Sequence, residues 1–116
     1  MVKPRLCVVL SKPMKHRHEL CTVVPLSTTA PKPPQPYHCR INIPFALPPK
    51  WGQQERWLKG DMIYNAGYHR VDLLRLGKDG TGKRVYQTET LSADTIAQIQ
   101  RCVLHSLSLS ALTKHV

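Results

Sequence analysis

An arginine and a group of hydroxyl side chains flank two short apolar segments of this sequence. Arg5 directly precedes residues 6–11, and the serine and threonines at 27–29 close residues 20–29. Both segments are rich in β-branched residues, so we expect two strands. If they pair antiparallel across residues 12–19, Arg5 and the hydroxyls lie at the same end of the sheet. A guanidinium beside hydroxyl groups is suited to bind one phosphate.

The loop that would join these two strands is strongly basic. Two lysines, one arginine and two histidines lie in it: Lys12, Lys15, His16, Arg17 and His18. We interpret Lys12, Lys15 and Arg17 as side chains that follow a nucleic-acid backbone. The alternative interpretation, a solvated hairpin loop, applies about equally to each of them.

The charge of the whole chain favours the same kind of partner. Among 116 residues, 17 lysines and arginines stand against 7 acids, which gives a formal charge of +10. This imbalance favours a polyanion, against the alternative of a basic domain with no nucleic-acid role. The length suits one domain with a modest core.

The sequence gives no sign of a membrane segment, an export signal or a metal site. No apolar run approaches the ~20 residues of a membrane span, and residues 1–5 lead straight into a strand without a cleavage site. The four cysteines form no CxxC pair and no zinc spacing, so we expect small apolar packing and neither metal nor cofactor. A reducing cytoplasm is the simplest compartment.

Further strands must complete the sheet that positions Arg5 and the hydroxyls. Residues 38–43 alternate between apolar and polar, and residues 62–76 read as one long strand, bent by a bulge at Gly67. An Asp-Gly turn at 77–83 leads back into a strand at 84–90.

A helix follows from Ala93 to Leu107, with Ser92 as its N-cap. Four apolar residues recur at helical spacing and are expected to face the sheet: Ile96, Ile99, Val103 and Leu107. The predicted fold is mostly β, a small antiparallel sheet curled into a barrel and closed by a C-terminal helix.

Two proline-containing segments allow alternative interpretations. Residues 30–36 are either a stiff connector between strands or a ligand for a proline-reading domain. Residues 45–58 read as irregular and carry Trp51 and Trp57. These indoles either stack on bases or cover a core edge or a dimer contact.

Several of these motifs together resemble one protein family. Arg5-Leu6-Cys7-Val8-Val9-Leu10-Ser11 is similar to the Arg-Pro-x-Val-Val-Leu-Ser strand of the MazF/PemK toxins of toxin–antitoxin pairs. Val24-Pro25-Leu26-Ser27-Thr28 resembles their second signature, a strand ending in Val-Pro-x-Thr or Val-Pro-x-Ser. Val71-Asp72-Leu73-Leu74-Arg75-Leu76 is similar to their Val-Asp-x-x-Arg-Leu, and Leu91-Ser92 opens a helix where theirs begins.

The resemblance implies an SH3-like small barrel of the CcdB/PemK-like toxin fold that forms a homodimer. Members cut single-stranded RNA without a metal and are silenced by a cognate antitoxin protein. The ribose 2′-OH attacks the adjacent phosphate, which leaves a 2′,3′-cyclic phosphate and a 5′-OH. The family's catalytic arginine and hydroxyl correspond to Arg5 and Ser27.

The chemistry of these residue types agrees with such a reaction. Arg5 is always charged, so it suits oxyanion stabilisation and is a poor base. Ser27, or the neighbouring Thr28, can hydrogen-bond a non-bridging phosphate oxygen. A histidine is the best candidate for the general base. The candidates are His16, His18 and His69, and Arg70 is added to the expected RNA-binding residues.

The sequence departs from the family pattern in three ways. The chain begins at Met1, immediately before the arginine strand, so we expect a single MazF/PemK-like domain over residues 1–116 that lacks the family's usual N-terminal strand and loop. Leu6 replaces the usual proline. Ser27 stands where many members have threonine, and the hydroxyl is kept.

Two further functions remain open at this level. Related topoisomerase-poisoning toxins use this fold without nuclease chemistry and bind their target largely through the C-terminal helix, whose end here is apolar at residues 104–109. A passive SH3-like RNA-binding module would bind RNA in a salt-dependent way and release no products.

Overall fold

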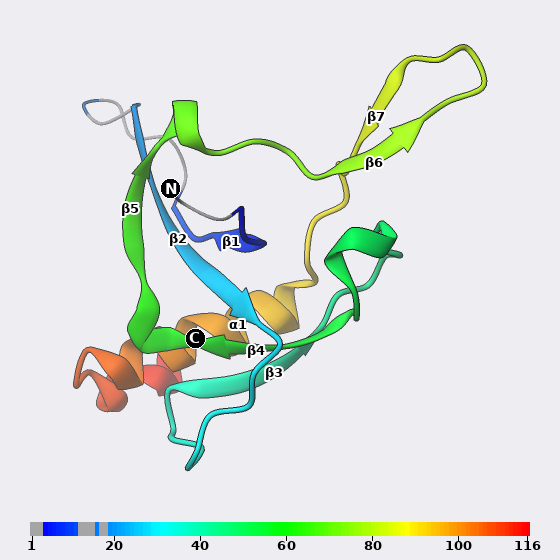
Figure 1. The fold of residues 1–116 in the computed structure, drawn as a ribbon. Helices are drawn as coiled ribbons and strands as arrows, with labels where there is room; N and C mark the ends of the chain where they lie inside the picture. Colours follow the sequence, from blue (N-terminus) through cyan, green and yellow to red (C-terminus); the bar gives the residue numbers. More distant parts are fainter. Residues whose placement is uncertain (1–3, 12–15, 17–18) are drawn as a thin grey trace.

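The computed structural model describes residues 4–11, 16 and 19–116, a mostly β fold with one α-helix near the C-terminus (Figure 1). The expected fold class is confirmed. Four loop residues expected to bind RNA or supply a base, Lys12, Lys15, Arg17 and His18, lie outside the described residues. The elements in chain order are β1 (Cys7–Val9), β2 (Leu20–Ser27), β3 (His38–Asn42), η1 (Pro49–Trp51), β4 (Glu55–Lys59), η2 (Gly60–Met62), β5 (Tyr64–Gly67), η3 (Tyr68–Arg70), β6 (Arg75–Lys78), β7 (Arg84–Tyr86), α1 (Ala93–Ser106) and η4 (Ser110–His115).

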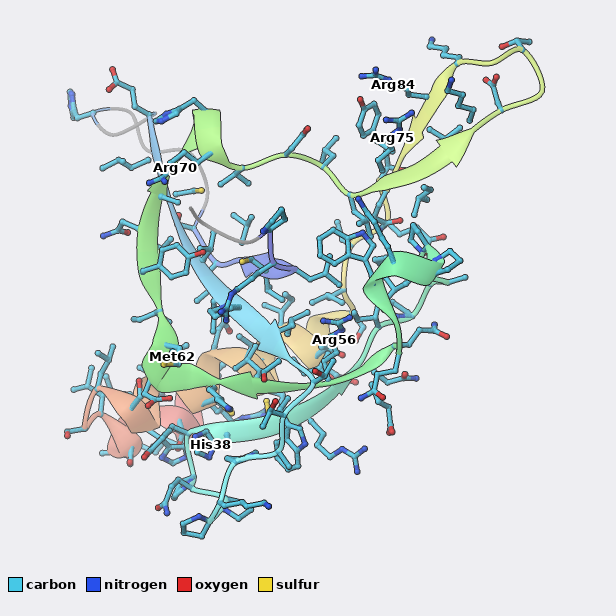
Figure 2. All side chains as sticks on the ribbon, in the orientation of Figure 1. His38, Arg56, Met62, Arg70, Arg75 and Arg84 are labelled. Atoms are coloured by element: carbon cyan, nitrogen blue, oxygen red, sulfur yellow. The ribbon has the colours of Figure 1, made fainter. Side chains whose placement is uncertain are left out.

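The strand β2 is the centre of the main sheet, whose order is β1-β2-β4-β3. Its first half pairs antiparallel with β5 and its last two residues pair with β4, while β1 runs along its other edge. The segment from β4 to β5 therefore turns a corner at η2 (Figure 1; Met62 marks this corner in Figure 2). Residues 30–36 lie between β2 and β3, as expected of a connector.

The change of partner along β2 occurs at Pro25. The amide of Leu26 donates to the carbonyl oxygen of Leu6, just before β1, at 2.9 Å. The backbone nitrogen of Pro25 therefore faces the opposite edge of β2. Proline has no N–H to donate there. The β5 pairing ends at Val23 and the β4 pairing begins at Leu26, on either side of this missing donor.

The alternation of side chains along β2 gives the sheet two different faces. Val24 and Leu26 point into the main core, together with Leu58 of β4 and Ile41 of β3. The helix α1 closes this core with Ile99 and Cys102, both buried. The intervening residues of β2 lie on the other side, which we call the outer face.

The helix α1 begins as the sequence predicts. The hydroxyl of Ser92 accepts a hydrogen bond from the amide of Thr95, which confirms the N-cap. Ile99 is fully buried, but Leu107 follows the helix and is 52% exposed, so its expected place on the sheet-facing side was wrong. Cys102 is the residue that continues the buried face, because it lies three residues after Ile99.

The four cysteines lie as expected, three in strands and one in the helix. Cys21, Cys39 and Cys102 are buried free thiols, and Cys7 is partly exposed. A hydrogen bond with Cys102, together with burial, raises the pKa of Cys39 well above its ordinary value. Cys39 is therefore a neutral thiol that packs between β3 and α1.

The segment 45–58, expected to be irregular, contains the strand β4. Its sequence mixes charges with a tryptophan, which hides the period of two. The charged Arg56 is itself buried, because its guanidinium donates to the carbonyl oxygens of Trp51 and Gln53. A residue that looked solvent-facing thus occupies a core position of the sheet.

The segment 62–76 does not form one long strand. β5 ends at Gly67, a 3₁₀ turn follows over η3, and β6 starts only at Arg75. The ring of His69 lies against Gly67, where a Cβ atom would be 2.6 Å from its Cε1. The chain therefore turns out of the sheet here instead of continuing past a bulge.

The strands β6 and β7 form a separate hairpin that projects from the sheet (Figure 1). Its turn is the expected Asp-Gly turn, and β7 is shorter than expected. Asp79 accepts hydrogen bonds from the Thr81 hydroxyl and amide and from the Lys83 amide. These bonds lower the pKa of Asp79 and hold the turn.

Candidate functional site

Arg5 and Ser27 lie opposite each other at one end of the β1–β2 pair. Cys7 pairs with Pro25, and the hydrogen bond between Leu26 and Leu6 carries the same register one residue further. Continued by one more residue, this register sets Arg5, which precedes β1, against Ser27. In this register they fall at a non-hydrogen-bonded position, where opposing side chains lie closest and on one face.

The hydroxyl of Ser27 is held by the turn that follows β2. Its Oγ accepts a hydrogen bond from the amide of Thr29 at 3.0 Å. This bond uses one acceptor site of the hydroxyl and orients the group at the strand end. Ser27 is half-buried, whereas Arg5 and Thr28 are exposed, so an anion can reach this strand end from solvent.

The outer face next to Arg5 carries a tyrosine that the sequence reasoning did not single out. The hydroxyl of Tyr64 on β5 lies 3.7 Å from the Sγ of Cys7 on β1. This hydrogen bond and partial burial raise the pKa of Tyr64, while the charges of Arg5 and Arg70 act to lower it. Both guanidinium groups therefore act on the same phenol, which stays protonated at neutral pH.

Arg70 on η3 lies toward the other end of β2 from Ser27, because β5 ends at Gly67, which is paired with Leu20. Figure 2 shows it beside the end of β5 at which η3 begins, well apart from Arg75 and Arg84 on the β6–β7 hairpin. His69 precedes it in the same turn and packs on Gly67. Of the three histidines considered as a base, His16 lies exposed in the β1–β2 loop.

The side of Ser27 away from Arg5 is occupied by aromatic and basic residues. Trp57 of β4 is directly opposite Ser27, and Arg40 of β3 is directly opposite Trp57. The Cζ of Arg40 lies 5.6 Å from the centre of the Trp57 ring. A second such pair, Lys50 over Trp51 at 5.1 Å, belongs to η1.

The sequence indicated Arg5, Ser27 and Trp57 as candidates, but it gave no signal for Tyr64 and none for the place of Trp57 beside Ser27. Arg5 and Ser27 stand at the ends of two neighbouring strands, so their meeting follows from a simple hairpin. Tyr64 and Trp57 reach the site through pairings with β2 that only the folded chain reveals. Within the described part of the chain, no three His, Cys, Asp or Glu residues lie close enough to hold a metal ion.

No helix among the described residues has the length and apolar character to cross a membrane.

Comparisons with known proteins give the same assignment as the strand signatures. The chain is 30% identical over 115 residues to the uncharacterized protein YifN of Escherichia coli (strain K12), an alignment that covers 97% of this chain and 72% of YifN. Residues 1–107 match the family model described as the PemK-like, MazF-like toxin of type II toxin–antitoxin systems. The observed fold, mostly β with a C-terminal helix, is consistent with that family. The chain therefore belongs to the PemK-like toxins of type II toxin–antitoxin systems.

Proposed function

We propose that this toxin is a metal-independent endoribonuclease that cuts single-stranded RNA, with Arg5 and Ser27 at the scissile phosphate. The observation that carries the proposal is the opposition of these two residues at one open strand end. Members of the family are generally endoribonucleases. The formal charge of +10 suits an RNA substrate.

The proposed reaction is an internal transfer at phosphorus. The ribose 2′-oxygen forms a bond to phosphorus and loses its proton to a base, while the bond to the 5′-oxygen breaks and that oxygen gains a proton. The products are a 2′,3′-cyclic phosphate and a 5′-OH. Negative charge on the non-bridging oxygens grows in the transition state, and Arg5 supplies the opposing charge.

Neutral hydroxyls complete the proposed phosphate site. The oxygen of Ser27 accepts from the Thr29 amide, and its proton makes only a long 3.5 Å hydrogen bond to the Thr29 carbonyl oxygen, which a phosphate oxygen can replace. The hydroxyl of Thr28 follows directly in the chain. Tyr64 is protonated at neutral pH, since its pKa is raised, so it donates to a phosphate oxygen or to the leaving 5′-oxygen. A histidine remains the candidate base, although His16 and His69 belong to the opposite end of the β1–β2 pair from Arg5 and Ser27. His69 is the first to test.

The family supplies the wider setting. A type II toxin implies a cognate antitoxin protein as a partner. A homodimer and a cytoplasmic location, where single-stranded mRNA is available, are part of the proposal.

The direct test is incubation of the purified protein with single-stranded RNA in EDTA, followed by analysis of the new ends. Cleavage with 2′,3′-cyclic phosphate and 5′-OH ends is expected. Arg5→Ala should abolish it, whereas Arg84→Ala, which removes the same charge from the distant hairpin, should retain it. Intact RNA from a folded, dimeric preparation, or equal losses in both variants, would contradict the proposal.

The apolar end of the chain favours a second candidate, a toxin that acts by binding a topoisomerase. Four apolar residues at and after the end of α1 are exposed: Leu107, Leu109, Leu112 and Val116. A surface of this kind suits a protein partner. Topoisomerase-dependent DNA breaks on adding the protein, with RNA left intact, would favour this candidate over the nuclease.

A further inference from the structure

A row of four side chains crosses the outer face of the sheet. Ser27 is paired with Trp57, Trp57 is paired with Arg40, and the β1–β2 register puts Arg5 on the other side of Ser27. Directly paired residues of antiparallel strands point to the same face. The row therefore reads arginine, serine, tryptophan, arginine across β1, β2, β4 and β3.

The neighbouring row shows that this face is not the one that builds the core. Leu26, Leu58 and Cys39 are paired with one another across the same strands, and all three are buried in the main core. Side chains one residue along each strand point the opposite way. Trp57 is accordingly only half-buried and Arg40 is exposed, so the row faces away from the core.

The arginine in this row is available to a ligand. Arg40 donates to Glu55 at 2.7 Å, but both side chains are more than half exposed. An exposed ion pair of this kind contributes little to stability. A phosphate can replace the carboxylate, because it binds the same planar guanidinium through charge-assisted, bidentate hydrogen bonds.

We propose that Trp57 and Arg40 form a nucleotide-binding subsite next to the Arg5–Ser27 pair. A base of single-stranded RNA stacks on the indole of Trp57, and Arg40 binds the phosphate beyond it. The subsite extends the proposed nuclease function and relies on a phosphate bound at Arg5 and Ser27 for its position.

The spacing of the sheet suits this arrangement. Adjacent strands lie about 4.8 Å apart, so Trp57 is one strand away from Ser27 and Arg40 is two strands away. A base next to a phosphate at Ser27 is thus within reach of the indole. The ligand must be single-stranded, because the flat faces of bases in a duplex are covered by their neighbours.

Fluorescence of Trp57 tests the stacking directly. The chain has two tryptophans, so Trp51→Phe leaves Trp57 as the sole reporter. The probe is a single-stranded decamer of mixed sequence, 2′-O-methylated throughout so that it lacks the attacking hydroxyl. The control is a decamer of the same backbone with abasic residues. We expect the decamer with bases to quench Trp57 and the abasic decamer to leave it unchanged.

Matched variants separate this subsite from the rest of the surface. Trp57→Ala should weaken binding of the labelled decamer about 10-fold or more, with Trp57→Phe intermediate. Trp51→Phe should bind like the unaltered protein. Arg40→Ala should reduce the salt dependence of binding by about one phosphate contact, whereas Lys50→Ala, from the other cation–indole pair, should not. Thermal unfolding of each variant checks that it is folded.

The outcomes distinguish this inference from the nuclease proposal. Quenching of Trp57 by the decamer in a protein that fails to cut unmodified RNA supports the subsite and contradicts the nuclease. RNA cleavage with no change in Trp57 emission, equal quenching by the abasic decamer, or no binding of the decamer overturns the subsite.

Discussion

The hydroxyl of Tyr64 and the thiol of Cys7 meet 3.7 Å apart across β2, although their strands lie on opposite edges of it. The contact spans the outer face over Val23, which is paired with Tyr64. This explains why Val23 is only 1% exposed although it points away from the main core. The same contact holds a protonated phenol where the charges of Arg5 and Arg70 both act on it.

We expect Tyr64→Phe to lower the kcat for RNA cleavage about 10- to 100-fold with little change in KM. The ring that covers Val23 is kept, and only a donor to the phosphate is lost. The loss is smaller than the 10²–10³ typical of an enclosed oxyanion donor, because Tyr64 is 47% exposed. Steady-state kinetics on a fluorogenic RNA measure it, with Tyr86→Phe on β7 as the control.

The pH dependence of this effect follows from the direction of the pKa shift. The pKa of Tyr64 is raised from 10.0, so the proton is retained below that pH and lost only above it. The ratio of unaltered to Tyr64→Phe activity should therefore stay constant between about pH 7 and 9.5. A ratio that declines within this range would contradict a protonated donor.

Substitutions of Ser27 should separate the effect of its hydroxyl group on activity from the effect of side-chain size. We expect Ser27→Thr to keep most of the activity and Ser27→Ala to lose about 10-fold or more, because only the second removes the donor. The free energy of unfolding of both variants should lie within about 0.5 kcal/mol of the value for the unaltered protein, since Ser27 is at a half-buried strand end. The control is Ser110→Ala on η4. Equal activity of all three variants would exclude Ser27 from the site.

His69→Gln tests the base. An imidazole with an ordinary pKa of about 6.5 accepts a proton only above that pH, so a histidine base makes activity rise with pH through this range. If His69 is the general base, His69→Gln removes the rise of activity with pH and His16→Gln keeps it. A profile that is flat from pH 5 to 8 in the unaltered protein would remove histidine from the mechanism.

Gly60→Ala should destabilise the fold at the corner between β4 and β5. A Cβ atom at Gly60 would lie 2.7 Å from the backbone C and O of Cys102, which α1 holds in position. We expect the free energy of unfolding to fall by about 1–3 kcal/mol. The midpoint of thermal unfolding should then be lower by several degrees. Gly80→Ala, where a Cβ meets nothing within 4 Å, is the matched control. Similar midpoints for the two would contradict the packing described.

The sequence predicted those features that depend on neighbours along the chain. The opposition of Arg5 and Ser27 follows from a single hairpin, and the helix start follows from Ser92. The strand β4 was missed because Arg56 is charged yet buried by bonds to nearby carbonyls. The pattern of apolar and polar residues in the sequence does not show that hydrogen bonds to carbonyl oxygens allow this charged side chain to be buried.

The parts of the site that come from β4 and β5 could not be predicted for a related reason. Tyr64 and Trp57 are seven residues apart, and the turn at η2 pairs them with two residues of the same strand, Val23 and Ser27. The expected long strand over 62–76 would have extended straight past the site. Register between distant strands depends on the packed core, which one sequence does not display.

The missing amide hydrogen of Pro25 has a consequence for how the site is spread out. With an amide donor at that position, one continuous strand made of residues 55–67 would pair with the whole edge of β2. Instead the ribbon divides into two arms, one bearing an indole and the other a phenol. Pro25 in the central strand thus helps to keep the Trp57 indole and the Tyr64 phenol on different sides of Arg5.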